Sequence, residues 1–481
     1  MLTLAEASAV TFNIETEVTQ TYYEELLKYT YQNYIQPKAQ LFANIKQTAV
    51  GGDYVLDFTF LEPDGKWRID VDIKTGKPIE ITMTPSDASV PKSALDRLKE
   101  DLIIVVQFFE DHVRRSTLYF AWVQGKEVVP EKSPFRRARV IEKIFFGNIL
   151  FLFVLLIAIS LVLFVFLGLW AAVVIVAGQF LIILFSDRLI GTLSDWPISA
   201  QNPTVHILQY HLPPQERAAF TQKYDRQKLL QIKKEIYDKT IALGKPVECE
   251  TAREVMSKYG LQCSPENMAT KAVNVYEMVE KTTQKYGLPI PKIALSNTMV
   301  PNAAASGPSP KHGIVLITTG LLVQLDEDEI LSVLGHELSH LSARDPFVLF
   351  GLVTGEYVFR LFVLLSFMQS FNPILFYLYL FFVFGAIYFV AKFFEARADL
   401  ESAIKMGNPK VLAGALRKIG FRRLQFERNL SYRIQDWITW DPHPPIYFRV
   451  ERLEKFEPTR QVKHTLLQSA KDCIRGFFAA F

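Results

Sequence analysis

Two long apolar stretches constrain the fold of this chain more than any other feature. The first runs from Ile144 to Ser186 and contains no Asp, Glu, Lys or Arg. The second runs from Phe347 to Ala391 and is interrupted only by Glu356 and Arg360. A helix of about 20 apolar residues crosses a bilayer, so each stretch is long enough for two spans. A pair of soluble helices buried in a core would rarely stay free of charge for so long.

Turn signals divide each stretch into a hairpin. Gly168-Leu169-Trp170 marks a reversal in the first stretch, and Asn372-Pro373 marks one in the second. Glu356 and Arg360 are four residues apart on the third span, so we expect them to neutralise each other inside the bundle. A transport role for this pair is the alternative. The sequence thus predicts an α-helical integral membrane protein with four spans in two hairpins, at residues 141–188 and 346–394.

The remaining segments are predicted to fold outside the bilayer. Residues 1–135 form a small α+β domain, because alternating apolar strands with turn chemistry between them precede and follow an amphipathic helix. Lys74-Thr75-Gly76 and its flanking strands weakly resemble a PepSY module, and an unrelated small sheet domain is the alternative. Residues 1–45 read as mostly helical, and 196–270 as a polar, helix-rich insertion. The expected elements are strands at 54–60, 67–73, 79–83 and 117–123, and a helix at 94–115.

The sequence Gly335-His336-Glu337-Leu338-Ser339-His340 carries the chemistry. It contains the H-E-x-x-H pattern, in which two histidines four residues apart lie on one face of a helix and reach the same metal ion. The segment Asp326–Glu329 predicts a capped helix start before it. A chance match is the alternative, but a motif that lies on a capped helix and has further acidic residues downstream makes chance a poor explanation.

A catalytic zinc site needs a third protein ligand and one open position. Glu395 and Asp399 follow directly after the fourth predicted span, where their helix leaves the bilayer close to the first zinc helix. We therefore predict Glu395 as the third zinc ligand, one zinc per chain, and Asp399 as the residue that orients a ligand imidazole. A surface salt-bridge helix is the alternative explanation for these acids. Glu337 is expected to act as general base rather than as a ligand.

Charge and cysteine content predict the surroundings of the chain. Its net charge of +3 gives no sign of a nucleic-acid partner, so the expected partners are polypeptides and lipid. Three cysteines without C-x-x-C spacing, Cys249, Cys263 and Cys473, are expected to be reduced thiols in a cytosolic setting. Basic residues flank the spans, and the positive-inside rule then places the N-terminal and catalytic parts in the cytoplasm of a plasma or inner membrane. These basic residues are Lys132, Arg136, Arg137, Arg139, Lys143, Arg188, Arg344 and Lys392.

The order of motifs between residues 270 and 460 resembles the HtpX-type membrane zinc metallopeptidases, which are relatives of the CAAX prenyl proteases. The run 301–307 (Pro-Asn-Ala-Ala-Ala-Ser-Gly) precedes the zinc helix and Asp345, and a membrane hairpin follows. Glu395-x-x-Ala398-Asp399 and then His443-Pro444-Pro445 with Arg449 complete the series. Four spans rather than seven argue against a prenyl protease.

This resemblance implies a zincin-like α+β catalytic domain of the gluzincin type, split into 271–345 and 395–481 by the second hairpin. It implies that Asn302 and Ala303 lie on an edge strand that binds peptide substrate. It also implies that His443 and Arg449 line the cleft, His443 as a catalytic residue and Arg449 in support of the site, and it leaves open which of the two acts at the oxyanion. By residues alone, 301–307 is equally a loop of small residues.

The expected activity is zinc-dependent endopeptidase cleavage of unfolded or damaged membrane proteins in quality control. Two alternatives remain open at this stage. One is a site-selective processing protease of the CAAX type. The other is a membrane scaffold or chaperone that binds zinc without proteolysis, although such a protein has no need of Glu337 beside the first histidine.

Overall fold

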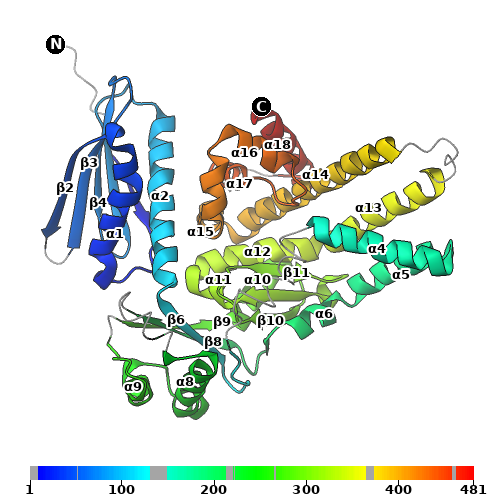
Figure 1. Ribbon diagram of the computed structural model, residues 1–481, viewed down its shortest axis with the longest axis horizontal. Helices are drawn as coiled ribbons and strands as arrows, with labels where there is room; N and C mark the ends of the chain where they lie inside the picture. Colours follow the sequence, from blue (N-terminus) through cyan, green and yellow to red (C-terminus); the bar gives the residue numbers. More distant parts are fainter. Residues whose placement is uncertain are drawn as a thin grey trace. The chain divides into compact units, whose positions relative to one another are not determined.

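The computed structural model describes residues 9–50, 53–130, 149–212, 220, 223–264, 267–364, 373–457 and 462–481 (Figure 1). The chain divides into two compact units. The first unit comprises Met1–Tyr119, Leu208–Asp225 and Val247–Thr270, and the second comprises the rest. Helices dominate the described part. The basic run at 132–143 and the predicted turn residue Asn372 lie outside the described residues.

The first unit is built on a five-stranded antiparallel sheet in the order β1-β5-β4-β3-β2. Its strands alternate in burial: in β4, Ile69, Val71 and Ile73 are buried while the residues between them are exposed. These side chains form one core with apolar residues of α1 and α2. The bounds are β1 Val10–Ile14, α1 Tyr23–Thr30, β2 Phe42–Val50, β3 Asp53–Leu61, β4 Arg68–Lys74, β5 Ile79–Pro85 and α2 Lys92–Arg114.

The strands and helix predicted between residues 54 and 115 are confirmed, whereas the helical reading of residues 1–45 is only partly right. Short helical turns η1 (Gln20–Tyr22), η2 (Tyr31–Ile35) and η3 (Gln36–Leu41) do surround α1. However, β1 and β2 are strands: β1 pairs with the distant β5, and β2 pairs with β3, the next strand along the chain. Pairing with a formed sheet overrides a weak local helical pattern.

The predicted helical insertion at 196–270 also contains strands. Helices α8 (Arg226–Lys239) and α9 (Cys249–Lys258) are present, with the turn η5 (Ile241–Leu243) between them. The segment also supplies β8 (Thr204–His211) to a three-stranded sheet in the order β6-β8-β9, with β6 at Thr117–Val123 and β9 at Met268–Asn274. Since 208–225 and 247–270 belong to the first unit, the insertion is not one separate body.

The prediction that the cysteines are all reduced is wrong. Cys249 and Cys263 form a disulfide, with their Cα atoms 5.5 Å apart, and only Cys473 is a free, buried thiol. The two cysteines are 14 residues apart, and this separation does not match a C-x-x-C motif. The pairing arises because the chain turns back after α9, which the residue types did not reveal.

The second unit contains a four-stranded sheet in the order β11-β12-β10-β7, with β10 and β12 parallel and the other pairs antiparallel. Strand β11 lies at one edge of this sheet. The bounds are β7 Trp196–Ile198, α10 Val275–Tyr286, β10 Lys292–Ser296, β11 Ala303–Ser306, η6 Pro310–His312, β12 Ile314–Thr318, α11 Thr319–Gln324 and α12 Glu327–Ala343.

The apolar stretches form helices, as predicted. Helices α4 (Ile149–Leu167) and α5 (Trp170–Leu184) are joined at Gly168, whose positive φ of 54° makes the reversal. Helix α6 (Ser186–Leu193) continues α5 after a bend of 64°. The second stretch supplies α13 (Asp345–Phe359), η7 (Arg360–Leu364) and α14 (Pro373–Met406).

Within the described residues, one helix is long and apolar enough to cross a membrane, namely the Ile374–Met406 part of α14. The bent pair α5–α6 would make a second if it acts as one span. The four-span arrangement therefore stays a prediction. The expected charge pair does form, since Nε of Arg360 lies 3.0 Å from Oε1 of Glu356, and the hydroxyl of Tyr379 on α14 donates to the same oxygen.

The C-terminal segment packs against α14. It consists of α15 (Pro409–Glu427), α16 (Leu430–Ile438), α17 (Ile446–Glu454) and α18 (Thr465–Ala479). Buried Trp437 and Cys473 form a small core with Phe389 and Phe393 of α14 and Phe477 of α18. As a result of this packing, the loop between α16 and α17 lies beside α14 at the end of its apolar part.

Candidate metal centre

Helix α12 positions the two histidines of the H-E-x-x-H motif. Its start is fixed by the predicted capping box: Oδ1 of Asp326 accepts the Glu329 N–H at 2.8 Å, and Oε2 of Glu329 accepts the Asp326 N–H at 3.0 Å. Ile330, Leu334, Leu338 and Leu341 are buried on the helix and hold it in the unit. His336 is buried and His340 is half-buried.

Helix α14 brings Glu395 against both imidazoles. Oε2 of Glu395 lies 3.3 Å from Nε2 of His336, and its Oε1 lies 3.4 Å from Nε2 of His340. The two Nε2 atoms lie 3.3 Å apart. One ligand atom from each of the three residues falls within 4.8 Å of the others, so together they could hold a metal ion.

The spacing and the chemistry of these donors fit zinc. Two ligand atoms at about 2.1 Å from a tetrahedral zinc lie roughly 3.4 Å apart, which matches the three separations here. Oε2 of Glu395 is buried, and among the described residues it makes no hydrogen bond of good geometry, although Nε2 of His336 lies 3.3 Å away. An unsatisfied buried carboxylate oxygen is costly, and a bound cation would remove that cost.

A carboxylate lies behind each imidazole. Nδ1 of His336 lies 2.9 Å from Oδ1 of Asp399, and both oxygens of Asp399 accept hydrogen bonds from Arg449 at 2.7 and 2.8 Å. Such contacts fix the tautomer and the ring orientation of a metal ligand. Asp399 and Arg449 therefore lie behind a histidine of the site, as the sequence predicted, although their roles remain predictions.

The partner of the second histidine was missed at the sequence level. Nδ1 of His340 lies 2.7 Å from Oδ2 of Asp345, which also accepts a hydrogen bond from Arg397 at 2.6 Å. Asp345 begins α13, and Arg397 lies between Glu395 and Asp399 on α14. The sequence did contain a hint of this contact. Arg397 lies between the two predicted site acids Glu395 and Asp399, and an arginine there can reach a third acidic residue, which is Asp345. Each histidine thus has its own aspartate–arginine pair.

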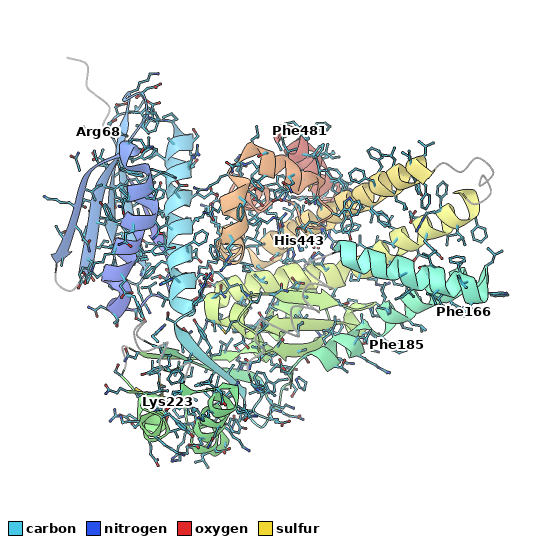
Figure 2. The ribbon with its side chains drawn as sticks, in the orientation of Figure 1. Arg68, Phe166, Phe185, Lys223, His443 and Phe481 are labelled. Atoms are coloured by element: carbon cyan, nitrogen blue, oxygen red, sulfur yellow. A yellow bond between two sulfur atoms is a disulfide. The ribbon has the colours of Figure 1, made fainter. Side chains whose placement is uncertain are left out.

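His443, which is labelled in Figure 2, lies in the loop between α16 and α17. Its Nε2 is 3.5 Å from Oε2 of Glu395, while its Nδ1 and backbone N–H both contact Oδ1 of Asp441. Its side chain is 48% exposed, so one side of the imidazole stays open to a substrate. Arg423 holds Asp441 from the other side at 2.7 Å.

Lys392 holds the His443 loop and was not predicted as a site residue. It is completely buried on α14, one turn before Glu395. Its ammonium group donates to the carbonyl oxygens of Thr439, Asp441 and His443. A buried lysine needs such partners, so the loop and the helix fix each other.

Glu337 faces the edge strand rather than the ligand group. Its Oε2 accepts the backbone N–H of Ala305 in β11 at 2.8 Å. The predicted strand position of Ala303 is confirmed, since Ala303 pairs with Ile317 of β12. Asn302 directly precedes the strand, and its N–H donates to Thr318 Oγ1 at 2.9 Å. Binding of substrate by this edge stays a prediction.

The surrounding charges favour a cation at this site. Burial lowers the pKa of His336, but the hydrogen bonds and charges of Asp399 and Glu395 outweigh burial and raise this pKa to about 10. Burial raises the pKa of Glu337, against the lowering effect of the two histidines. A carboxylate with a raised pKa is a better general base near neutral pH.

Comparisons with known proteins agree with this geometry. The family model Peptidase family M48 matches residues 269–457. A protease HtpX homolog of Desulforapulum autotrophicum is 30% identical over 214 residues, which cover 38% of this chain and 68% of that protein. The chain belongs to peptidase family M48. The matched residues include the whole metal-binding group, His443 and Arg449.

Other M48 relatives match over shorter lengths. A protease HtpX homolog of Thermodesulfovibrio yellowstonii is 41% identical over 91 residues, covering 19% of this chain and 31% of that protein. This chain thus spans about a third of the length of curated relatives of this kind. The crystal structure of S. mikatae Ste24p covers 76% of each chain at 11% identity, and its TM-score of 0.35 is too low to support an argument.

The M48 site depends on close packing of α12 against α14 at Gly335. A Cβ atom placed on Gly335 would lie 2.8 Å from Oγ of Ser402 and 2.9 Å from Cγ of Met406, both on α14. Ser402 cannot easily move, because its hydroxyl donates to the Ser332 carbonyl at 2.6 Å. Gly335 immediately precedes His336, so any separation here moves a histidine away from Glu395.

We predict that Gly335→Val weakens zinc binding about tenfold, because overpacking a tight interface costs about 1–3 kcal/mol. Isothermal titration of the metal-stripped protein with zinc measures the effect. The matched control is Gly385→Val on α14, where an added Cβ meets nothing within 4 Å. Equal zinc affinity in the two variants would contradict the role assigned to the α12–α14 contact.

Proposed function

We propose that this protein is a membrane-integrated zinc endopeptidase that cleaves unfolded or damaged membrane proteins. The observation that carries the proposal is a two-histidine, one-carboxylate group with Glu337 beside it. Three protein ligands leave one zinc position for water or substrate, as catalytic sites require. Membership of peptidase family M48 supports the same reaction.

Each residue of the site has a distinct role in the proposed reaction. His336, His340 and Glu395 would hold the metal ion, which when bound lowers the pKa of a water molecule to about 7 and polarises the scissile carbonyl. Glu337 takes a proton from the attacking water and delivers it to the leaving amine. His443, half-exposed beside Glu395, donates a hydrogen bond to the oxygen on which negative charge develops.

The edge strand β11 supports an extended polypeptide as substrate. Among the described strands, β11 pairs only with β12. Apart from the Ala305 N–H, which Glu337 accepts, its outer edge offers backbone groups to which a peptide adds as a further strand. Ala303 and Ala304 are small, so they leave room for the side chains of such a peptide. A folded protein cannot present an extended segment in this way, so we propose unfolded or damaged chains as substrates.

Zinc-dependent cleavage of casein in mild detergent tests the proposed activity. We expect the wild type to cleave after zinc is restored to the metal-stripped protein. We expect Glu337→Gln to bind about one zinc but to cleave more slowly by about 10²- to 10⁴-fold, the usual contribution of a general base. Equal cleavage by wild type and Glu337→Gln would refute this mechanism. Zinc binding without cleavage by either protein would favour a scaffold.

We also propose that the N-terminal and catalytic parts face the cytoplasm, because basic residues flank the apolar stretches. Arg188 and Arg344 lie on described flanks of this kind. The disulfide between Cys249 and Cys263 argues in the other direction, since disulfides persist mainly in oxidising compartments. The two observations therefore make opposite predictions about orientation.

Reporter fusions after Phe481 test the orientation in cells. A C-terminal green fluorescent protein should fluoresce if the C-terminal segment is cytoplasmic, and an alkaline phosphatase fusion at the same position should be inactive. The reverse result would show that the disulfide, not the flanking charge, indicates the compartment. The Cys249→Ser variant serves as a control that the disulfide does not itself set the orientation.

A further inference from the structure

Helix α18 carries two apolar faces, and only one of them is covered. On the covered face, Cys473 is fully buried and the ring of Phe477 lies 5.5 Å from that of Phe389 on α14. The other face consists of Leu467, Ile474 and Phe478, and Phe481 directly follows the helix. These side chains are 60%, 42%, 70% and 68% exposed.

The exposed residues form a single stripe. Their spacing of seven, four and three residues places them on one side of a helix. Lys471 and Arg475 are exposed along one edge of this stripe. An apolar stripe bordered by basic residues is the pattern of a helix that lies in the surface of a membrane with anionic lipid.

The position of α18 along α14 indicates what covers the stripe. The apolar part of α14 begins at Ile374, and about 20 residues are needed to cross a bilayer, so the span reaches to about residue 394. Phe389, the contact of α18, lies inside this length. At 1.5 Å per residue it is about 9 Å from Glu395 along the helix. The α18 stripe is therefore at the depth where α14 enters the bilayer.

The loop after α16 also contacts the apolar part of α14, and it reaches about 8–12 Å further along this helix than Phe389 does. The ring of Trp440 lies 5.8 Å from Phe381 and 6.1 Å from Phe384, both within the apolar part of α14. Ile438, two residues earlier, is 49% exposed. Tryptophan is favoured at the interface between lipid and water, where one part of its ring is apolar and its N–H is polar.

From these contacts we infer that the outer face of α18, together with Ile438 and Trp440, is embedded in the membrane surface and is covered by lipid. The exposed apolar surface of this face continues that of the span, where Phe382 is 68% exposed. The embedded face fixes the height of His443, three residues after Trp440, at the bilayer surface. A peptide segment would then be cut where it emerges from the membrane.

The inference rests on the proposed membrane integration of α14 but not on proteolysis. Single cysteines carrying a nitroxide label test it in proteoliposomes of phosphatidylcholine and phosphatidylglycerol. Labels at Phe478→Cys and at its neighbour Ala479→Cys form a matched pair, because both positions are exposed and they point about 100° apart on the helix. Phe382→Cys reports the span itself. Cys473 is buried, and the chain without an added cysteine gives its background labelling.

We expect the label at 478 to collide several-fold more often with oxygen, which dissolves in lipid, than with a water-soluble nickel chelate. The label at 479 should show the opposite preference, and the label at 382 should resemble 478. Equal access of the chelate to 478 and 479 would overturn the inference. So would shielding of 478 from both reagents, which would indicate a second protein chain on this face.

A chelate-accessible label at 382 would instead refute the membrane span on which the inference rests. Because no activity is measured, failure of the peptidase proposal leaves this result unaffected. Ile474→Cys provides a second position on the stripe if the Phe478 variant does not fold, and it should report lipid in the same way.

Discussion

The close contact between α12 and α14 is the constraint on which the rest of the site depends. One helix supplies two imidazoles and the other supplies Glu395, and their nitrogen and oxygen atoms lie 3.3 to 3.4 Å apart only because Gly335 carries no side chain. Each imidazole is held from behind by an aspartate, and each aspartate by an arginine. Among the described residues, Glu395 contacts histidines and forms no ion pair with an arginine. The arrangement thus leaves one buried carboxylate for which a metal ion is the natural partner.

Helix α14 also links this chemistry to the proposed membrane span. The same helix is apolar over its first half, donates Lys392 to the loop of His443, and then supplies Glu395, Arg397 and Asp399 within two turns. A site built directly on the end of a span is fixed at a set height relative to the bilayer. Rigid helices hold such a site more accurately than loops do.

Residue patterns predicted the local parts of this site well. The capped helix and the two histidines four residues apart follow from helical spacing, which is a local property. Glu395 and Asp399 were predicted from their position directly after the last predicted span. The contacts of Arg397 and Lys392 depend on which helices and loops meet, and that is decided by tertiary packing. The contact of Asp345 with His340 and the pairing of β2 with the next strand are short-range, but no residue pattern revealed them. The Cys249–Cys263 disulfide had no motif spacing. The four-span arrangement rests on composition alone, and a single described helix meets the requirements of a span by itself.

Zinc-edge X-ray absorption of the zinc-loaded protein tests the central claim most directly. We expect the spectrum to show one zinc with two imidazole nitrogens at about 2.0–2.1 Å and carboxylate or water oxygens at about 2.0–2.2 Å. The imidazole signal should be halved in His336→Ala and retained in Glu395→Ala. A sulfur ligand, or a spectrum unchanged by His336→Ala, would show that zinc binds elsewhere and would contradict the metal centre described here.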